Sequence, residues 1–181
     1  GRFLGPDTIH VEGPAGDRTL TFVKAAICTG ARASAPPTPG LQEAGYLTNE
    51  TVFSLTELPQ RIGVIGAGPI GCELAQSFAR FGSQVYLIEA AHGIMPNEDR
   101  DAADIVEQQM VRDGVKVLCC GKQLQVGKTE GGTRLMVGSH GQQYDVTVDA
   151  ILVGVGRTPN VEGIGLEVAG VDYDKNGITV N

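Results

Sequence analysis

A glycine-rich turn between an apolar run and a helical pattern constrains this chain more than any other stretch. Residues 61–65, Arg-Ile-Gly-Val-Ile, are typical of a parallel strand buried on both faces. Gly66, Gly68 and Gly71 follow in the spacing Gly-x-Gly-x-x-Gly. Apolar residues then recur at helical spacing from Ile70 onward, so the glycines lie where a strand becomes a helix. In such a unit the first glycine permits a tight turn, the second lets a phosphate approach the backbone, and the third lets the helix pack closely on the strand.

The next strand supplies a second part of the same pattern. A helix that begins at the glycines offers free N–H groups and partial positive charge to a diphosphate. The apolar run 85–88 ends at Glu89, about twenty residues past the glycines, where a dinucleotide site needs a carboxylate for the adenosine ribose hydroxyls. This carboxylate would repel a 2′-phosphate, so the sequence favours NADH over NADPH. The alternatives are a purely structural Gly-rich turn and a surface glutamate at a strand end.

The composition excludes several classes of protein. The 181 residues carry a net charge of −7 and show no cluster of Lys and Arg, so we expect no binding to nucleic acid. The apolar runs are much shorter than the roughly twenty residues that span a bilayer, and no signal-peptide pattern opens the chain. We therefore expect no membrane partner and a cytoplasmic location. The chain begins with Gly1 rather than Met, from which we expect a piece of a longer protein.

The four cysteines do not form a recognised metal or redox motif. None stands in a Cys-x-x-Cys pair, so the sequence predicts neither a zinc site nor a thioredoxin-type centre. The vicinal pair Cys119-Cys120 can bind a soft metal or form a strained disulfide, but its place at the end of a predicted strand favours small buried residues. Cys72 is interpreted as helix packing. His92 is interpreted as a solvated loop residue rather than an acid–base group.

The remaining sequence predicts an α/β fold. Before the glycine turn we expect a hairpin within residues 8–23, a short strand at 25–30 and a Pro-rich connector at 36–40. After the second strand, Asn97 is expected to cap a helix whose first turn is acidic. That helix is expected to close at Asp113-Gly114.

The second half of the chain predicts the rest of the sheet. Residues 115–118 predict a third parallel strand, and residues 121–148 predict an antiparallel β-meander in place of a helical crossover. Residues 149–156 predict a buried strand that ends in glycines. Ligands in open α/β sheets lie beyond the carboxyl ends of the strands, so this end is expected near the glycine turn.

Five segments together resemble the pyridine nucleotide-disulfide oxidoreductases. They are Ile27–Ala31, the connector at 36–40, Gly66–Glu73, Glu89 and Val155–Asn160. Within that family the chain is most similar to the dihydrolipoamide dehydrogenase and mercuric reductase branch. The resemblance implies a Rossmann-like NAD(P)-binding domain with a parallel sheet and an inserted meander, flanked by β-strips of an incomplete FAD-binding domain.

The resemblance also implies domain limits. Residues 42–161 would form the NAD(P)-binding domain. Residues 1–41 and 162–181 would belong to the FAD-binding domain, with Cys28 in place of an alanine that is usual in the family's Ala-Thr-Gly motif.

The cofactor contacts implied by the resemblance fall into two groups. For NAD they are Gly66, Ala67, Gly68, Pro69, Ile70, Gly71 and Glu73 along the pyrophosphate and nicotinamide, Glu89 at the ribose, the backbone of Gln123 at the adenine and the backbone of Gly156 at the nicotinamide. For FAD they are Thr29, Gly30 and Ala31. Ile70 would occupy a gating position beside the flavin, and Glu73 would pair with a lysine that this chain lacks.

The activity implied is the transfer of hydride from NAD(P)H through flavin to a cysteine pair, with a disulfide, lipoamide or Hg(II)-type acceptor. The family's first Gly-rich FAD motif, its redox cysteine pair and its C-terminal His-Glu dyad do not occur in this sequence. No residue is therefore assigned a catalytic or metal-binding role. The chain alone is expected to be inactive, and the longer enzyme is expected to form a homodimer through a C-terminal domain.

Two other interpretations stay open. One is a module of an NADH oxidase or a ferredoxin-reductase-like flavoenzyme. The other is an autonomous NAD-binding redox sensor in which Cys119-Cys120 is the sensing pair.

Overall fold

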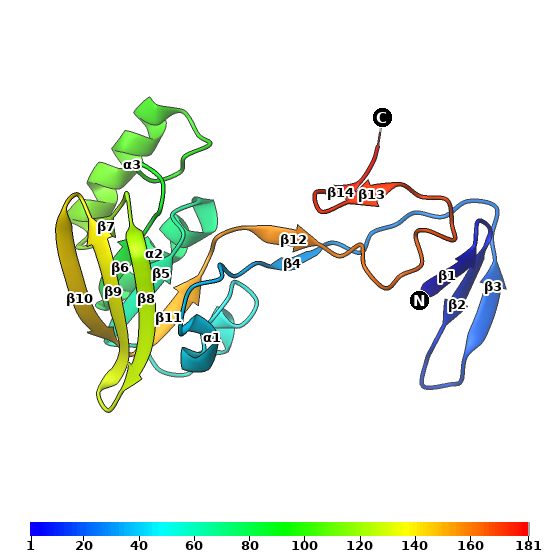
Figure 1. The fold of residues 1–181 in the computed structure, drawn as a ribbon, viewed down its shortest axis with the longest axis horizontal. Coiled ribbons are helices and arrows are strands. Elements are labelled where there is room, and N and C mark those ends of the chain that lie inside the picture. The colour runs from blue at the N-terminus through cyan, green and yellow to red at the C-terminus, as the bar shows by residue number, and fades with distance from the viewer. Residues whose placement is uncertain (181) are drawn as a thin grey trace. The chain divides into compact units, whose positions relative to one another are not determined.

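The computed structural model describes residues 1–180, which divide into two compact units (Figure 1). Unit 1 combines residues 1–32 with the residues from 157 onward, and unit 2 is Ala33–Gly156. The chain passes from one unit to the other near residues 33 and 156, whereas the sequence placed the domain limits at 42 and 161. The assignment of these units to NAD and FAD stays a prediction.

A parallel sheet of four strands forms the centre of unit 2. Its strand order is β11-β5-β6-β7, and every neighbouring pair is parallel. The predicted α/β class and the predicted parallel strands are therefore confirmed. The bounds are Arg61–Ile65 for β5, Gln84–Ile88 for β6, Lys116–Leu118 for β7 and Ala150–Val153 for β11.

Helices cover one face of this sheet. Alternate side chains of β5, Ile62 and Val64, pack in one core cluster with residues of α2 (Pro69–Phe81) and α3 (Arg100–Arg112), among them Phe78 and Met110. Strands with neighbours on both sides and layers on both faces exclude water, which is why their sequences are nearly continuous in apolar residues.

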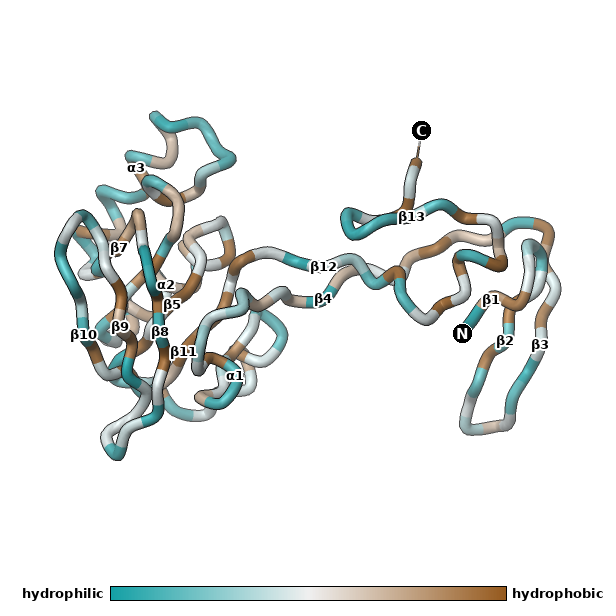
Figure 2. Tube along the Cα trace, in the orientation of Figure 1, coloured by the Kyte–Doolittle hydropathy of each residue, from teal (hydrophilic) through white to brown (hydrophobic). Residues whose placement is uncertain are grey.

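The other face carries the predicted β-meander, which the structure confirms. Its strands are β8 (Lys122–Thr129), β9 (Gly132–Ser139) and β10 (Gln142–Val148), in the order β10-β9-β8 and antiparallel. Gly63 of β5 lets the meander approach closely, because a Cβ there would lie 2.4 Å from Leu135 Cδ1. Figure 2 shows the contrast in hydropathy between β11, which is hydrophobic along its length, and the largely hydrophilic β8.

The part of unit 2 that precedes β5 contains two short helices. They are α1 (Leu41–Ala44) and the 3₁₀ helix η1 (Val52–Ser54). Gly40 precedes α1 with φ of 79°, and a Cβ at this position would lie 1.8 Å from the carbonyl oxygen of Val126. The connector is therefore held against β8 by a contact that only glycine permits.

Unit 1 is built from short strands. β2 (Thr8–Val11) and β3 (Arg18–Thr21) form the predicted hairpin, and β1 (Arg2–Gly5) adds a strand that the sequence did not predict. The pairs β4 (Ala31–Ala33) with β12 (Arg157–Pro159), and β13 (Tyr173–Asp174) with β14 (Gly177–Ile178), complete the unit. Its apolar cluster is small and centres on Phe3, Val161 and Leu166.

Two local predictions are wrong. Residues 25–30 are not a strand, because this segment has no partner in any sheet of the described residues, and β4 begins only at Ala31. Asn97 does not cap α3. The backbone N–H of Glu98 donates to Met95 in a turn, so the helix begins later, with Asp99 at the N-cap position.

Within residues 1–180, each helix is too short or too polar to cross a membrane.

Candidate functional site

The glycine turn has the close packing that its spacing predicts. Gly66 has φ of 99°, a left-handed conformation that favours glycine, and its N–H donates to Ile88 at 2.8 Å. A Cβ at Gly71 would lie 1.9 Å from the carbonyl oxygen of Gly66. The first turn of α2 therefore rests directly on the end of β5, and any side chain at position 71 would push the two apart.

Gly68 differs from its neighbours because nothing fills the space beside it. It is the N-cap residue of α2 with φ of −71°, an ordinary conformation, and apart from its two chain neighbours no protein atom lies within 4 Å of where a Cβ would stand. Pro69 follows at the start of the helix, where its missing N–H costs no hydrogen bond. The folded chain itself does not require glycine at position 68. The close approach of a ligand to the backbone would be a reason for a glycine there.

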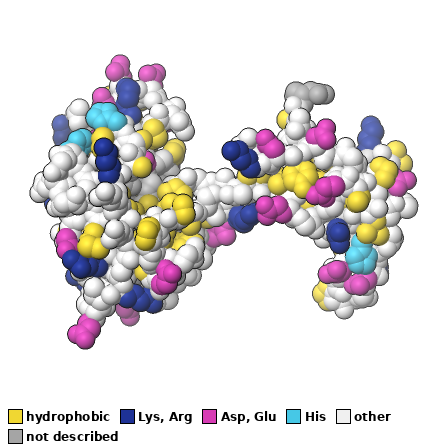
Figure 3. All heavy atoms as spheres, viewed as in Figure 1, with side chains coloured by type: hydrophobic (Ala, Val, Ile, Leu, Met, Phe, Trp, Pro, Cys, Tyr) yellow, Lys and Arg dark blue, Asp and Glu magenta, His cyan; other side chains and the backbone are white. Residues whose placement is uncertain are grey.

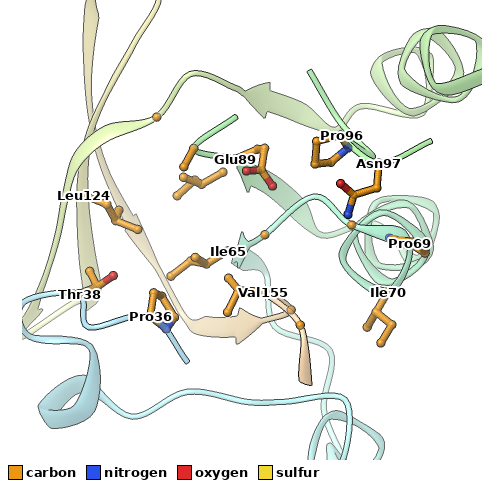
Figure 4. A pocket seen from close by; sticks show the side chains of 17 residues that line it. Pro36, Thr38, Ile65, Pro69, Ile70, Glu89, Pro96, Asn97, Leu124 and Val155 are labelled. Atoms are coloured by element: carbon orange, nitrogen blue, oxygen red, sulfur yellow. The ribbon is translucent and has the colours of Figure 1, made fainter. Parts of the chain in front are cut away.

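Glu89 joins the glycine turn to the loop after β6. Its Oε2 accepts a hydrogen bond from the backbone N–H of Ala67, and its Oε1 accepts one from Ala91, both at 2.8 Å. Figure 4 shows its carboxylate at the end of β6, on the side of the cavity that faces the glycine turn. The carboxylate is thus held in one orientation by backbone donors on either side.

A cavity of about 520 Å³ opens beside these residues. In Figure 4 the apolar side chains of Ile65, Val155, Pro36 and Leu124 surround one part of it, and Pro69, Pro96 and Asn97 surround another. Figure 3 shows exposed hydrophobic side chains gathered on this face of unit 2. An apolar cavity with a few fixed polar groups, at the carboxyl ends of parallel strands, is the usual form of a nucleotide site.

The structure brings part of the predicted set together. The predicted NAD contacts that line the cavity are Gly66, Gly68, Pro69, Ile70, Glu89 and Gly156. The others have different surroundings: Ala67 is buried and holds Glu89, Gly71 packs against Gly66, and Glu73 and Gln123 are exposed.

Gln123 lies at an irregularity near the start of β8, with φ of 54°. Its neighbours Gly121 and Leu124 line the cavity instead. A backbone contact from Gln123 to an adenine stays a prediction.

The predicted FAD residues belong to unit 1, where they form hydrogen bonds with Arg157 of β12 and with Asn160 directly after it. Thr29 Oγ1 donates to the carbonyl oxygen of Asn160 at 2.7 Å, and Asn160 Nδ2 donates back to Thr29 at 3.0 Å. The N–H of Asn160 donates to Gly30, and the carbonyl of Ala31 accepts from Arg157. These bonds join two of the segments on which the family resemblance rests.

The Gly-rich end of the 149–156 strand was expected near the glycine turn, and Gly154 and Val155 confirm this because they line the same cavity. The lining residues that sequence reasoning missed are Pro36, Thr38, Ile65, Ile88, Ala90, Pro96, Asn97, Gly121 and Leu124. Several of them end or directly follow parallel strands, so the rule that ligands lie at carboxyl ends could have found them. No sequence signal marks the connector residues Pro36 and Thr38, which reach the cavity through tertiary packing.

Cys72 has the packing role that the sequence predicted. It is buried at the start of α2, and its thiol donates to the carbonyl oxygen of Ala67 at 3.3 Å. Burial, with a smaller contribution from Glu89 and other acids, raises the pKa of Cys72 to about 12. The group stays a neutral thiol and is a poor nucleophile.

A strand, a glycine turn and a helix, followed by a carboxylate at the end of the next parallel strand, form an α/β domain of the Rossmann type. The family described as pyridine nucleotide-disulphide oxidoreductase matches residues 3–181. The chain belongs to this family.

Individual relatives agree with this membership. The chain is 33% identical over 180 residues to a dihydrolipoyl dehydrogenase of Bacillus subtilis, covering 99% of this chain and 39% of that protein. It is 31% identical over 175 residues to a mercuric reductase of Staphylococcus aureus, covering 97% and 31%. The solved Cu(II) complex of the HOCl-induced flavoprotein disulfide reductase RclA from Escherichia coli matches with a TM-score of 0.85 and 33% identity, covering 99% of this chain and 40% of that one. The chain thus spans about two fifths or less of these relatives.

Proposed function

We propose that this chain is the NAD(H)-binding part of an FAD-dependent disulfide oxidoreductase and holds NADH for hydride transfer to flavin in a longer enzyme. The observation that carries the proposal is the geometry at Gly68 and Glu89. The turn leaves open space at Gly68, where a phosphate would approach. The Glu89 carboxylate lies on the rim of the same cavity, where a ribose would follow.

The helix α2 would bind the pyrophosphate. An α-helix leaves its first N–H groups without intrahelical acceptors, and its N-terminus carries partial positive charge. Here that end lines the cavity at Gly68, Pro69 and Ile70, of which Gly68 and Ile70 carry a backbone N–H and Pro69 does not. Backbone N–H groups would thus bind the anion. In agreement with this, the cavity lining within residues 1–180 includes no Lys or Arg.

Glu89 would select NADH over NADPH. Each of its carboxylate oxygens accepts one backbone hydrogen bond, and an ionised carboxylate has about four acceptor positions, so capacity remains for ribose hydroxyls. A 2′-phosphate in the same place would meet a fixed negative charge. The structural hydrogen bonds keep the carboxylate from turning away.

The flavin, when bound, would accept the hydride and pass electrons onward. This chain would place the nicotinamide through Ile70 and the backbone of Gly156, with Thr29, Gly30 and Ala31 contacting FAD. The names of the relatives, dihydrolipoyl dehydrogenase and mercuric reductase, favour a disulfide or a thiol-bound Hg(II) as the final acceptor. A homodimer of the longer enzyme and a cytoplasmic location belong to the same proposal.

The test is calorimetric titration of the chain with NADH and NADPH. We expect the chain to bind NADH more tightly than NADPH. Glu89→Gln should weaken the binding of NADH by about tenfold, which corresponds to about 1.4 kcal/mol of interaction. It should also reduce the difference in affinity between NADH and NADPH. Glu130→Gln is the control, because Glu130 is exposed in the β8–β9 turn. Tighter binding of NADPH by the unmodified chain would refute the role of Glu89.

A further inference from the structure

Two cysteines and two histidines meet at the surface of unit 2, outside the nucleotide cavity. Cys119 and Cys120 follow β7, His92 lies in the loop after β6, and His140 lies in the turn between β9 and β10. We call these four residues the Cys–His cluster. Cys119 Sγ lies 3.0 Å from His140 Nε2, and Cys120 Sγ lies 3.3 Å from His92 Nδ1.

The donor atoms have the spacing of a metal site. The ligand atoms of Cys119, Cys120 and His140 all lie within 4.8 Å of one another. In a tetrahedral zinc site, bonds of about 2.3 Å to sulfur and about 2.0 Å to nitrogen place ligand atoms roughly 3.3–3.8 Å apart. The three groups therefore need only a small closure to share one ion. His92 lies outside this group of three but beside it, with its Nδ1 3.3 Å from Cys120 Sγ and its ring centre 6.3 Å from that of His140.

Backbone contacts hold the cluster in place. The carbonyl oxygen of Cys119 accepts from Ser139 Oγ at 2.5 Å, which ties β7 to the strand that leads into His140. The N–H of Cys120 donates to Ala91 at 2.9 Å, which ties it to the loop of His92. The three segments are thus joined before any ligand binds, and little ordering remains for a metal to impose.

The surroundings give access and a favourable charge. A hollow of about 380 Å³ opens onto Cys119, His92 and His140, and carboxylates of α3, Asp104 and Glu107, lie on its wall. Arg100 on the same wall is engaged with the carbonyl of Ile94 and with Asp104. Figure 3 shows histidine side chains at the surface of this unit. An entry path lined by acids suits the approach of a cation.

We propose that Cys119, Cys120 and His140, with His92 as the fourth ligand, bind one thiophilic d¹⁰ cation of the Zn²⁺ type. Two thiolates with two imidazoles are the donor set that this class of ion prefers, and hard cations such as Mg²⁺ or Ca²⁺ prefer oxygen. The ion would join the β6 loop, the end of β7 and the tip of the meander. It would therefore fasten the meander to the parallel sheet at a point beyond the nucleotide cavity.

The test uses the 181-residue chain, reduced and freed of metal, titrated with Co²⁺ and then with Zn²⁺ against a chromophoric chelator. We expect one equivalent of Co²⁺ to give the visible absorption of a tetrahedral site with a thiolate charge-transfer band, and Zn²⁺ to displace it. Cys120→Ser and His140→Asn should each weaken Zn²⁺ binding by at least about 100-fold, because loss of a supporting contact alone costs about 10–100-fold. His92→Asn should weaken it less.

Matched controls separate this site from adventitious binding. Cys28→Ser removes an exposed cysteine and His10→Asn removes a histidine of unit 1, and neither should change the Zn²⁺ affinity. Circular dichroism checks that Cys120→Ser and His140→Asn fold, which is expected because His140 is exposed and Cys120 is only half-buried. Absence of a tetrahedral Co²⁺ spectrum, equal affinity in the cluster variants and the controls, or a Cys119-Cys120 disulfide that persists under reducing conditions would each overturn the proposal.

Discussion

The glycine turn and the Cys–His cluster follow neighbouring parts of one parallel sheet but are built in opposite ways. Residues 66–71 form the turn as one continuous run, and its proposed binding role depends on the backbone: a left-handed Gly66, a missing side chain at Gly71 and an open space at Gly68. The Cys–His cluster takes its side chains from three loops that are distant in sequence. A site made from backbone can be recognised in a linear pattern, whereas a site made from side chains exists only after the loops are folded together.

The two regions share one structural support, the loop after β6. The side-chain carboxylate of Glu89 accepts a hydrogen bond from the N–H of Ala67 in the turn. The backbone carbonyl oxygen of Glu89 accepts one from the N–H of Gly121 at 2.7 Å. Two residues later the carbonyl of Ala91 accepts from Cys120. The turn is therefore anchored to this loop through the Glu89 side chain, and the segment of Cys120 is anchored to it by backbone hydrogen bonds. Variants can test how separately the two regions behave.

The thiols give the largest expected difference between the two regions. With its pKa raised to about 12 by burial, Cys72 beneath the turn should react with iodoacetamide about a thousandfold more slowly than an ordinary exposed thiol at about pH 8, since the thiolate is the reactive form. Cys120 in the cluster is half-buried, and burial together with Cys119 also raises its pKa, so an intermediate rate is expected.

Peptide mapping of native protein by mass spectrometry measures these rates, with exposed Cys28 as the internal reference. In concentrated urea the four cysteines should react alike. Labelling of Cys72 at the rate of Cys28 in native buffer would show that the turn does not shield it.

The second largest effect is expected from a pair of glycine variants that breaks the turn in two different ways. Gly71→Ala should lower the free energy of unfolding by about 2–3 kcal/mol, because its Cβ would meet the carbonyl of Gly66 at 1.9 Å and force α2 from β5. Gly68→Ala should cost less than about 1 kcal/mol, because its Cβ meets nothing.

Urea unfolding and NADH titration together separate stability from binding in this pair. Gly68→Ala should weaken the binding of NADH although the protein remains stable, because the new methyl group would occupy the space beside the turn. An unchanged affinity of Gly68→Ala for NADH would show that the space beside Gly68 does not hold a phosphate. Equal losses of stability in the two variants would show that α2 does not need a glycine at position 71 to pack on β5.

The difference between sites built from one continuous run and sites built from separate loops also decides how much of the molecule the sequence could predict. The parallel strands, α2 and the meander follow from apolar periodicity and turn residues, and the structure confirms them. Glu89 could be predicted as a cavity residue because one helix and one strand fix its distance from the glycines, and it lines the cavity. Its contact with a ribose stays a prediction. Its hydrogen bonds to Ala67 and Ala91 could not be found in this way, since they depend on how loops meet.

The errors have the same origin. Residues 25–30 have strand-forming composition, but a strand needs a partner, and pairing is a tertiary property. Asn97 is a good N-cap residue, yet a preceding turn delays α3 to Arg100, and Asn97 lines the cavity instead. The interpretation of Cys119-Cys120 as small buried residues is not one of these errors, because Cys119 is buried and Cys120 is half-buried. Nothing in the sequence, however, places His140 or His92 beside the pair.

The smallest effect is expected at the opposite end of the sheet, away from both regions. Arg61 at the start of β5 donates to Asp149 from its backbone N–H at 2.8 Å and from Nη2 at 2.5 Å, and this side-chain hydrogen bond lowers the pKa of Asp149. Asp149→Asn should lower Tm by about 2–4 °C at neutral pH without changing binding of NADH or Zn²⁺. Calorimetry against pH measures the loss.

The pH dependence of that loss has a definite sign. The folded-state pKa of Asp149 lies below its unfolded value of about 3.9, so its contribution to stability is present above that pH and is lost as the pH falls through the folded value. The difference between Asp149→Asn and the unmodified chain should therefore shrink in acid. Asp145→Asn is the matched control, because Asp145 pairs with Arg134 on the exposed meander and should matter less. A larger loss in Asp145→Asn would contradict the greater weight given to the Arg61–Asp149 pair. A change in ligand binding in Asp149→Asn would show that the two ends of the sheet are not independent.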